Sequence, residues 1–182
     1  MSAAPLVIVG DAILDVDIDG KATRLSPEAP VPVVDVERGW HRPGGAGLAA
    51  LLAARTDEDV VLITGIADDA AGHQLSDLLT SSGVRVVALP MRGSTVTKTR
   101  VRAGGQSVLR IDRGTAMPVT GPLPRAATAA LADARAICVA DYGRGVAALP
   151  ALREALAAAA ARTPVVWDPH PRGTEPVPRC RL

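Results

Sequence analysis

Carboxylates follow three apolar runs of the sequence and are the first candidates for chemistry. Asp11 follows the run Pro5 to Val9 after one glycine, Asp141 follows Ile137 to Ala140, and Asp168 follows Val165 to Trp167. In open α/β sheets, ligands bind beyond the carboxyl ends of the strands, where these side chains are expected to lie. A single aspartate at a strand end is more often a turn or helix-cap residue, so it is the group of three that favours function.

A second set of residues has the chemistry of a sugar site. Asp15 lies shortly after Asp11, and its carboxylate can accept hydrogen bonds from vicinal hydroxyls. Gly44 and Gly45 precede a predicted helix, where a ligand could approach the backbone close to free N–H groups. These glycines have neither the spacing of a dinucleotide-binding motif nor that of a P-loop, so neither NAD binding nor P-loop chemistry is supported.

Basic residues gather on a predicted hairpin strand. Alternation along Thr97 to Arg100 places Lys98 and Arg100 on one face, with Arg102 and Arg110 nearby. Such a group could hold an anion. The alternative is a solvated face that protects an exposed strand, and the residues alone favour this alternative.

Composition excludes several classes of protein. The 182 residues are 48% hydrophobic and 21% charged, which argues against a disordered chain, and the net charge of +1 with no basic block argues against nucleic-acid binding. We expect no membrane partner, because no apolar run approaches the ~18 residues of a membrane helix. Cys138 and Cys180 fit no metal or disulfide pattern, which indicates a reducing cytoplasm, and Cys138 is expected to be a buried small hydrophobe. His41, His73 and His170 show no metal spacing, and no hydrolase motif is present.

The pattern of short apolar runs and Ala- and Leu-rich stretches predicts an α/β fold, with a parallel sheet covered by helices. The predicted strands cover 5–9, 60–66, 84–89, 137–140 and 164–167, and the predicted helices cover 44–56, 69–82, 125–134 and 150–162. Strands with polar and apolar residues alternating, at about 13–19, 31–36, 95–102 and 107–111, are expected to form a small accessory sheet that could act as a lid. The prolines of Leu25 to Pro30 are expected to hold that segment extended.

The order and spacing of several motifs resemble the ribokinase-like (PfkB) sugar kinases. The motifs are VIVGDAILDVDIDG, RLSPEAPVPVV, RPGGAG, TVTKTRV, LRID, ADYGRGV and VVWDPHPRG. Within this family, the likeness is greatest to kinases of D-glycero-β-D-manno-heptose 7-phosphate, which often form the first half of a bifunctional ADP-heptose synthesis protein. The resemblance implies a three-layer α/β sandwich with a β lid, ATP and Mg²⁺ as cofactors, and a sugar phosphate as the small-molecule partner. It is also compatible with a homodimer formed through the lid strands.

The resemblance also implies roles for individual residues. Substrate contacts fall to Asp11, Asp15, Gly44, Gly45, Lys98, Arg100 and Arg110, with Lys98 and Arg100 holding the sugar's phosphate, while Asp141, Asp168 and His170 lie near the phosphoryl-transfer cleft. No metal ligand is assigned. Two positions depart from the family pattern: Leu48 replaces an asparagine that bonds the sugar, and His170 replaces a lysine.

The family pattern places its catalytic base in a later Gly-Ala-Gly-Asp motif, beyond Leu182. Residues 1–182 are therefore expected to be the N-terminal portion of the kinase domain, with the C-terminal part of the fold missing and the last strand left with an exposed edge. No residue is assigned as the base, and the chain alone is expected to be inactive. The alternative is a truncated protein that binds sugar phosphate, or assembles through its lid, without turnover.

Overall fold

The computed structural model describes residues 4–56 and 59–182. Its core is a five-stranded parallel sheet with the order β11-β10-β1-β4-β5. The strands are β1 (Leu6–Gly10), β4 (Val60–Gly65), β5 (Val84–Leu89), β10 (Ala136–Ala140) and β11 (Val165–Asp168). These are the continuous apolar runs of the sequence, as expected for strands that are covered on both faces.

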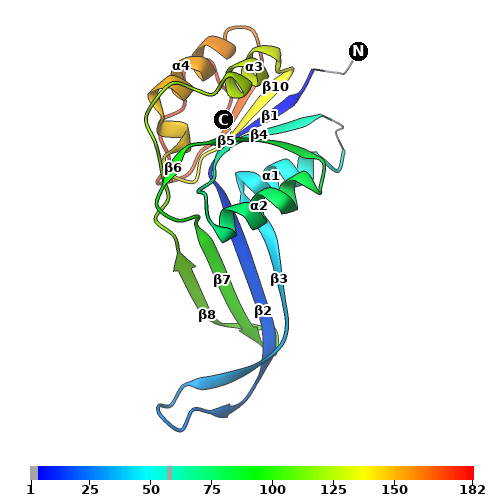
Figure 1. The fold of residues 1–182 in the computed structure, drawn as a ribbon, viewed down its shortest axis with the longest axis vertical. Coiled ribbons are helices and arrows are strands. Elements are labelled where there is room, and N and C mark those ends of the chain that lie inside the picture. The colour runs from blue at the N-terminus through cyan, green and yellow to red at the C-terminus, as the bar shows by residue number, and fades with distance from the viewer. Residues whose placement is uncertain (1–3, 57–58) are drawn as a thin grey trace.

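Helices cover both faces of this sheet (Figure 1). The helices are α1 (Ala46–Ala53), α2 (Ala70–Thr80), α3 (Arg125–Asp133) and α4 (Pro150–Ala159), with a short 3₁₀ turn, η1 (Val146–Ala148). Val7 and Val9 of β1 pack in the cluster that contains residues of α3 and α4, whereas Ile8 packs in the cluster that contains residues of α1 and α2. This alternation confirms the predicted α/β sandwich.

A second sheet of four strands forms the lid, in the order β3-β2-β7-β8. Its strands are β2 (Ala12–Leu25), β3 (Pro32–Gly45), β7 (Thr97–Ala103) and β8 (Gln106–Arg113). β2 pairs antiparallel with β3 and parallel with β7, which in turn forms a hairpin with β8. Figure 1 shows these strands extending away from the core, with β2 running on almost directly from β1.

The β2–β3 hairpin is longer than the sequence predicted, since each strand has 14 residues. Gly44 and Gly45 therefore end β3, paired with Ile13 and Ala12, and the helix begins only at Ala46. The expected extended segment after Leu25 is also wrong. Residues 26–30 form bends, and the N–H of Ser26 donates to the carbonyl of Val31 at 2.8 Å. The prolines thus shape the hairpin loop, which suits residues with no ladder N–H to donate.

Two smaller features were not predicted. β6 (Met91–Arg92) and β9 (Met117–Pro118) form a short antiparallel pair where the chain passes between the core and the lid. The edge of β11, expected to be open, is partly paired: the N–H of Trp167 donates to the carbonyl of Arg181 at 2.8 Å, and the N–H of Arg181 donates to Val165 at 2.9 Å. No helix in the described part of the chain is long and apolar enough to cross a membrane.

Candidate functional site

The pairing of the lid strands places Asp15 between two arginines. Asp15 lies opposite Arg42 of β3 and opposite Lys98 of β7, and its residue is only 4% exposed. The guanidinium of Arg100 donates to Oδ1 of Asp15 at 2.7 Å, and Arg42 lies 3.2 Å from Oδ2. Because each oxygen faces an arginine, the carboxylate is held in a fixed direction and keeps lone pairs for a ligand.

Asp17 is a second buried carboxylate on the same face of β2, and sequence reasoning missed it. Its Oδ2 accepts a hydrogen bond from Nε of Arg42 at 2.8 Å, and this bond is the main reason that the pKa of Arg42 is raised. Arg42 therefore bridges Asp15 and Asp17. The alternation of Asp15 and Asp17 was a usable signal, but the contribution of Arg42 depends on strand register.

Gly44 and Gly45 leave room for the carboxylate of Asp15 and for the backbone of Asp11. A β-carbon on Gly44 would lie 2.5 Å from Oδ2 of Asp15, and one on Gly45 would lie 2.3 Å from the carbonyl oxygen of Asp11. Gly45 also has a φ of 59°, in the left-handed region that favours glycine. The ring of Tyr142 reaches 3.4 Å from the same β-carbon position at Gly45. Both glycines are thus required by the local packing.

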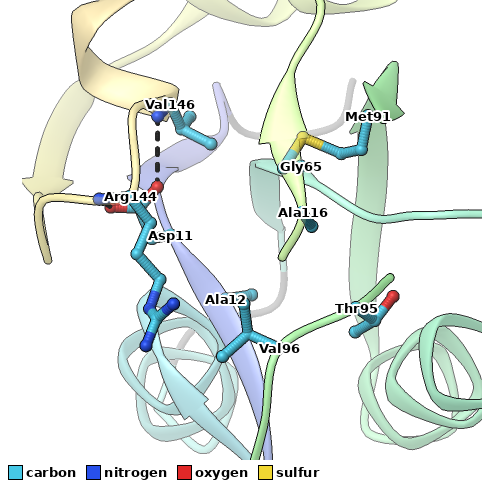
Figure 2. Close-up of a pocket in the computed structure, with 9 residues that line it drawn as sticks. All are labelled: Asp11, Ala12, Gly65, Met91, Thr95, Val96, Ala116, Arg144 and Val146. Carbon is cyan, nitrogen blue, oxygen red and sulfur yellow. Dashed lines mark hydrogen bonds between the residues drawn. The ribbon is translucent and has the colours of Figure 1, made fainter. Parts of the chain in front are cut away.

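Asp11 is clamped by the loop after β10. The backbone N–H groups of Tyr142, Arg144 and Val146 donate to its carboxylate at 3.0, 3.0 and 3.1 Å, and the last bond is drawn in Figure 2. Burial raises the pKa of Asp11, the three hydrogen bonds oppose this effect, and the charge of Asp141 adds to it. The sequence placed Asp11 beside the sugar, but its oxygens already hold this loop.

Asp141 anchors a second loop at the same edge of the sheet. Its Oδ1 accepts from the N–H of Gly143 at 2.8 Å, and its Oδ2 accepts from the N–H and hydroxyl of Thr174 at 2.6 and 2.9 Å. Strand register aligns Gly10, Ala140 and Asp168, so the three predicted carboxylates do occur at one edge. Asp11 and Asp141 are buried within their loops, whereas Asp168 is exposed.

His170 lies in the loop that Asp141 anchors. Its Nδ1 accepts from the N–H of Arg172 at 3.1 Å, and its ring lies 5.7 Å from that of Tyr142. Since Nδ1 is an acceptor in this bond, a neutral imidazole carries its proton on Nε2. Leu48, the other departure from the family pattern, lies half-buried in the first turn of α1.

The basic residues of the lid differ in their partners. Arg110 forms a bidentate ion pair with Asp112, in which its Nε donates to Oδ1 at 2.8 Å and its Nη2 donates to Oδ2. Lys98 is half-buried, and no hydrogen bond or ion pair links its ammonium to the residues that the structure describes. Burial lowers the pKa of Lys98, and the charge of Arg110 lowers it further. Lys98 is therefore the ammonium that an anionic ligand would stabilise most.

The chain matches the model of the pfkB family of carbohydrate kinases over residues 3–178. The chain belongs to this family. Its pfkB-family relatives include the bifunctional protein HldE of Streptomyces coelicolor, which is 51% identical over 98% of this chain, and that of Azorhizobium caulinodans, which is 38% identical over 94%. The chain spans only 37% and 38% of these two proteins.

Solved pfkB-type structures share the fold. Ribokinase of Arabidopsis thaliana, solved with ribose and ATP, aligns with a TM-score of 0.66 at 19% identity, covering 97% of this chain and 56% of that one. Phosphofructokinase-2 of Escherichia coli, solved with fructose 6-phosphate, aligns with a TM-score of 0.64 at 16% identity, covering 91% of this chain and 55% of that one. The core and lid thus have the arrangement of about half of such a kinase.

Proposed function

We propose that this chain is the sugar-binding part of a kinase that transfers the γ-phosphoryl group of ATP to a hydroxyl of heptose 7-phosphate. The observation that carries the proposal is the buried Asp15, fixed by Arg42 and Arg100 beside the gap at Gly44. The identity of 51% to an HldE protein over nearly the whole chain supports a shared substrate class.

In this proposal the sugar lies against Gly44 and Gly45, and Asp15 accepts hydrogen bonds from two of its hydroxyls. Carboxylates that are already charged and oriented bind hydroxyls without the cost of reorganising. The phosphate of the acceptor faces the cations of the lid. Among these, Lys98 makes no hydrogen bond or ion pair in the described part of the chain, although the charges of Asp15 and Asp112 act on it. Asp11 acts on the site by fixing the loop that carries Tyr142.

ATP would supply the phosphoryl group, and Mg²⁺ would balance its charge. Among the described residues, no group of three His, Cys, Asp or Glu side chains is placed to hold a metal ion. Both oxygens of Asp141 are engaged by backbone or hydroxyl donors. The exposed Asp168 and the half-buried His170 remain the candidates for contacts near the transferring group.

The binding part of the proposal is tested by calorimetric titration of the chain with heptose 7-phosphate. We expect binding that weakens at least ~10-fold in Asp15→Asn, because the amide loses one acceptor oxygen and its pairing with two arginines. Asp35→Asn is the matched control, since Asp35 pairs with Arg24 at an exposed position of the lid. No binding, or equal binding by Asp15→Asn, would contradict the proposal.

We also propose that the chain alone does not turn over, because the Gly-Ala-Gly-Asp motif that carries the family's catalytic base does not occur in its sequence. Incubation with ATP, Mg²⁺ and heptose 7-phosphate, followed by phosphorus NMR, should give no bisphosphate. Turnover that disappears in Asp15→Ala would show instead that this chain is sufficient.

The alternative function, binding or assembly without turnover, is favoured by the apolar side chains exposed on the lid, such as Val36 (61%) and Leu109 (53%). If the protein were monomeric at every concentration measured, the alternative of assembly through the lid would be contradicted. We place the protein in the cytoplasm because both cysteines are free.

A further inference from the structure

Two of the three lid cations that the sequence placed among the substrate contacts already have carboxylate partners. Arg100 donates to Asp15 at 2.7 Å, and Arg110 pairs with Asp112. If Arg100 left Asp15, this buried carboxylate would keep only Arg42 as a partner, and a poorly paired buried charge is costly. Arg100 is therefore a positioning residue for Asp15, and a phosphate needs cations from elsewhere.

Arg144 supplies such a cation from the core. Its backbone N–H is fixed by Asp11 at 3.0 Å, and the residue lines a small cavity at the root of the lid together with Val96 and Ala116. Figure 2 shows its side chain extending away from the hydrogen bond between Asp11 and Val146. No hydrogen bond or ion pair engages its guanidinium within the described part of the chain.

Arg144 and Lys98 share Asp112 as a neighbour, although they come from different layers of the molecule. Asp112 lies directly opposite Lys98 in the β7–β8 pairing. The charge of Arg144, like that of Lys98, helps to lower the pKa of Asp112, after the larger effects of Arg110. Arg144 also lines the same cavity as Val96, which directly precedes Thr97, the first residue of β7, so Arg144 lies at the end of the lid where Lys98 lies.

We propose that Arg144 contacts the phosphate of the acceptor from the core while Lys98 contacts it from the lid, so that this phosphate draws the two layers together. This inference rests on the proposed function, because it takes a phosphorylated sugar as the ligand. It makes Arg144 a specificity residue: it distinguishes a phosphorylated sugar from the same sugar without phosphate. A dianion held between two cations from separate layers is bound only when the lid is closed.

The test compares Arg144→Gln with wild type by calorimetry, using heptose 7-phosphate, the unphosphorylated heptose and inorganic phosphate. We expect Arg144→Gln to bind heptose 7-phosphate about 10- to 100-fold more weakly and to show less salt dependence. Binding of the unphosphorylated heptose should not change, and Arg144→Lys should recover part of the lost affinity. The backbone bond to Asp11 does not depend on the side chain, so the variants should fold.

Arg102→Gln is the matched control, because Arg102 lies on the same strand as Lys98 but is exposed further along the lid. Equal losses for the phosphorylated and unphosphorylated sugars, or no loss for either, would overturn the role of Arg144. If wild type bound neither sugar, the proposed acceptor would be wrong, and inorganic phosphate would still decide the role of Arg144. Phosphate binding that depends on Arg144 would support it, and binding that does not, or no binding, would refute it.

Discussion

Gly44 and Asp15 share one space, since a β-carbon on Gly44 would lie 2.5 Å from Oδ2 of Asp15. Glycine at this position is therefore a requirement of the carboxylate, and Asp15 can keep its two arginine partners only while residue 44 has no side chain. The backbone of β3 at Gly44 therefore determines where the carboxylate of Asp15 in β2 can lie.

Gly44→Ala should displace Asp15 and weaken binding of heptose 7-phosphate by about 10-fold or more, with a loss of stability of about 1 to 3 kcal/mol from overpacking. Calorimetry and thermal unfolding measure the two effects. Gly121→Ala is the control, because a β-carbon there meets no atom within 4 Å. Unchanged affinity in Gly44→Ala would show that Asp15 does not contact the acceptor.

Arg42→Ala should destabilise the protein by about 1 to 3 kcal/mol, because it leaves the buried Asp17 without its hydrogen bond and Asp15 with one arginine. Arg38→Ala removes a comparable but exposed ion pair with Asp19 and should cost about 0 to 1 kcal/mol. Urea unfolding of both variants makes the comparison. Equal losses in the two variants would mean that burial of the Asp15 and Asp17 pair has no energetic effect.

Asp69 caps α2 and also holds the entry to β7, since its carboxylate accepts from the N–H groups of Gly72 and Thr95, each at 2.7 Å. Burial acts to raise the pKa of Asp69, but the hydrogen bonds from Thr95 and Gly72 outweigh it, and the net shift is downward. We expect Asp69→Ala to lose about 1 kcal/mol at neutral pH.

This contribution should depend on pH in a defined direction. A folded pKa below the unfolded value gives stability that is complete above the unfolded pKa and lost as pH falls through the folded pKa. The stability difference between wild type and Asp69→Ala should therefore shrink as pH falls below 3.8, the ordinary value for this group. Asp68→Asn, at an exposed neighbouring position, controls for general acid effects. A difference that stayed constant with pH would rule out the ionised cap.

Cys138 should react slowly with iodoacetamide in the folded protein. Burial raises the pKa of its thiol, and the charge of Asp168 raises it further, so little thiolate is present at neutral pH. Mass spectrometry of the labelled Cys180→Ser protein isolates Cys138. Its labelling should be faster in denaturant, and equal rates in both conditions would contradict the burial.

The sequence predicted the strands that are buried on both faces, but it was misleading for strands whose two faces are both exposed to solvent. Continuous apolar runs such as Val60 to Ile63 predict core strands because nothing else in a small protein requires them. The parts of β2 and β3 that were not predicted, 20–25 of β2 and 37–45 of β3, carry polar residues on both faces and so lack the alternation that marks a strand. Their length follows from cross-strand pairing, which a single sequence does not reveal.

The candidate site shows the same division. Asp15, Gly44 and Lys98 could be selected from residue type and motif, because each has a chemistry that suits a sugar phosphate. Arg42 and Arg144 could not, since an arginine is ordinary on a surface and only strand register or a loop clamp gives these two their places. The division of the cations into paired and unpaired ones is likewise a property of the folded chain.

Asp11 is the residue between β1 of the core and β2 of the lid, and three amides of the loop after β10 grip its side chain. Any rotation of the lid about its root turns the backbone at this residue, so the same rotation pulls on the amides of Tyr142, Arg144 and Val146. Movement of the lid is therefore coupled to movement of the loop after β10. Hydrogen exchange at those three amides should follow lid movement.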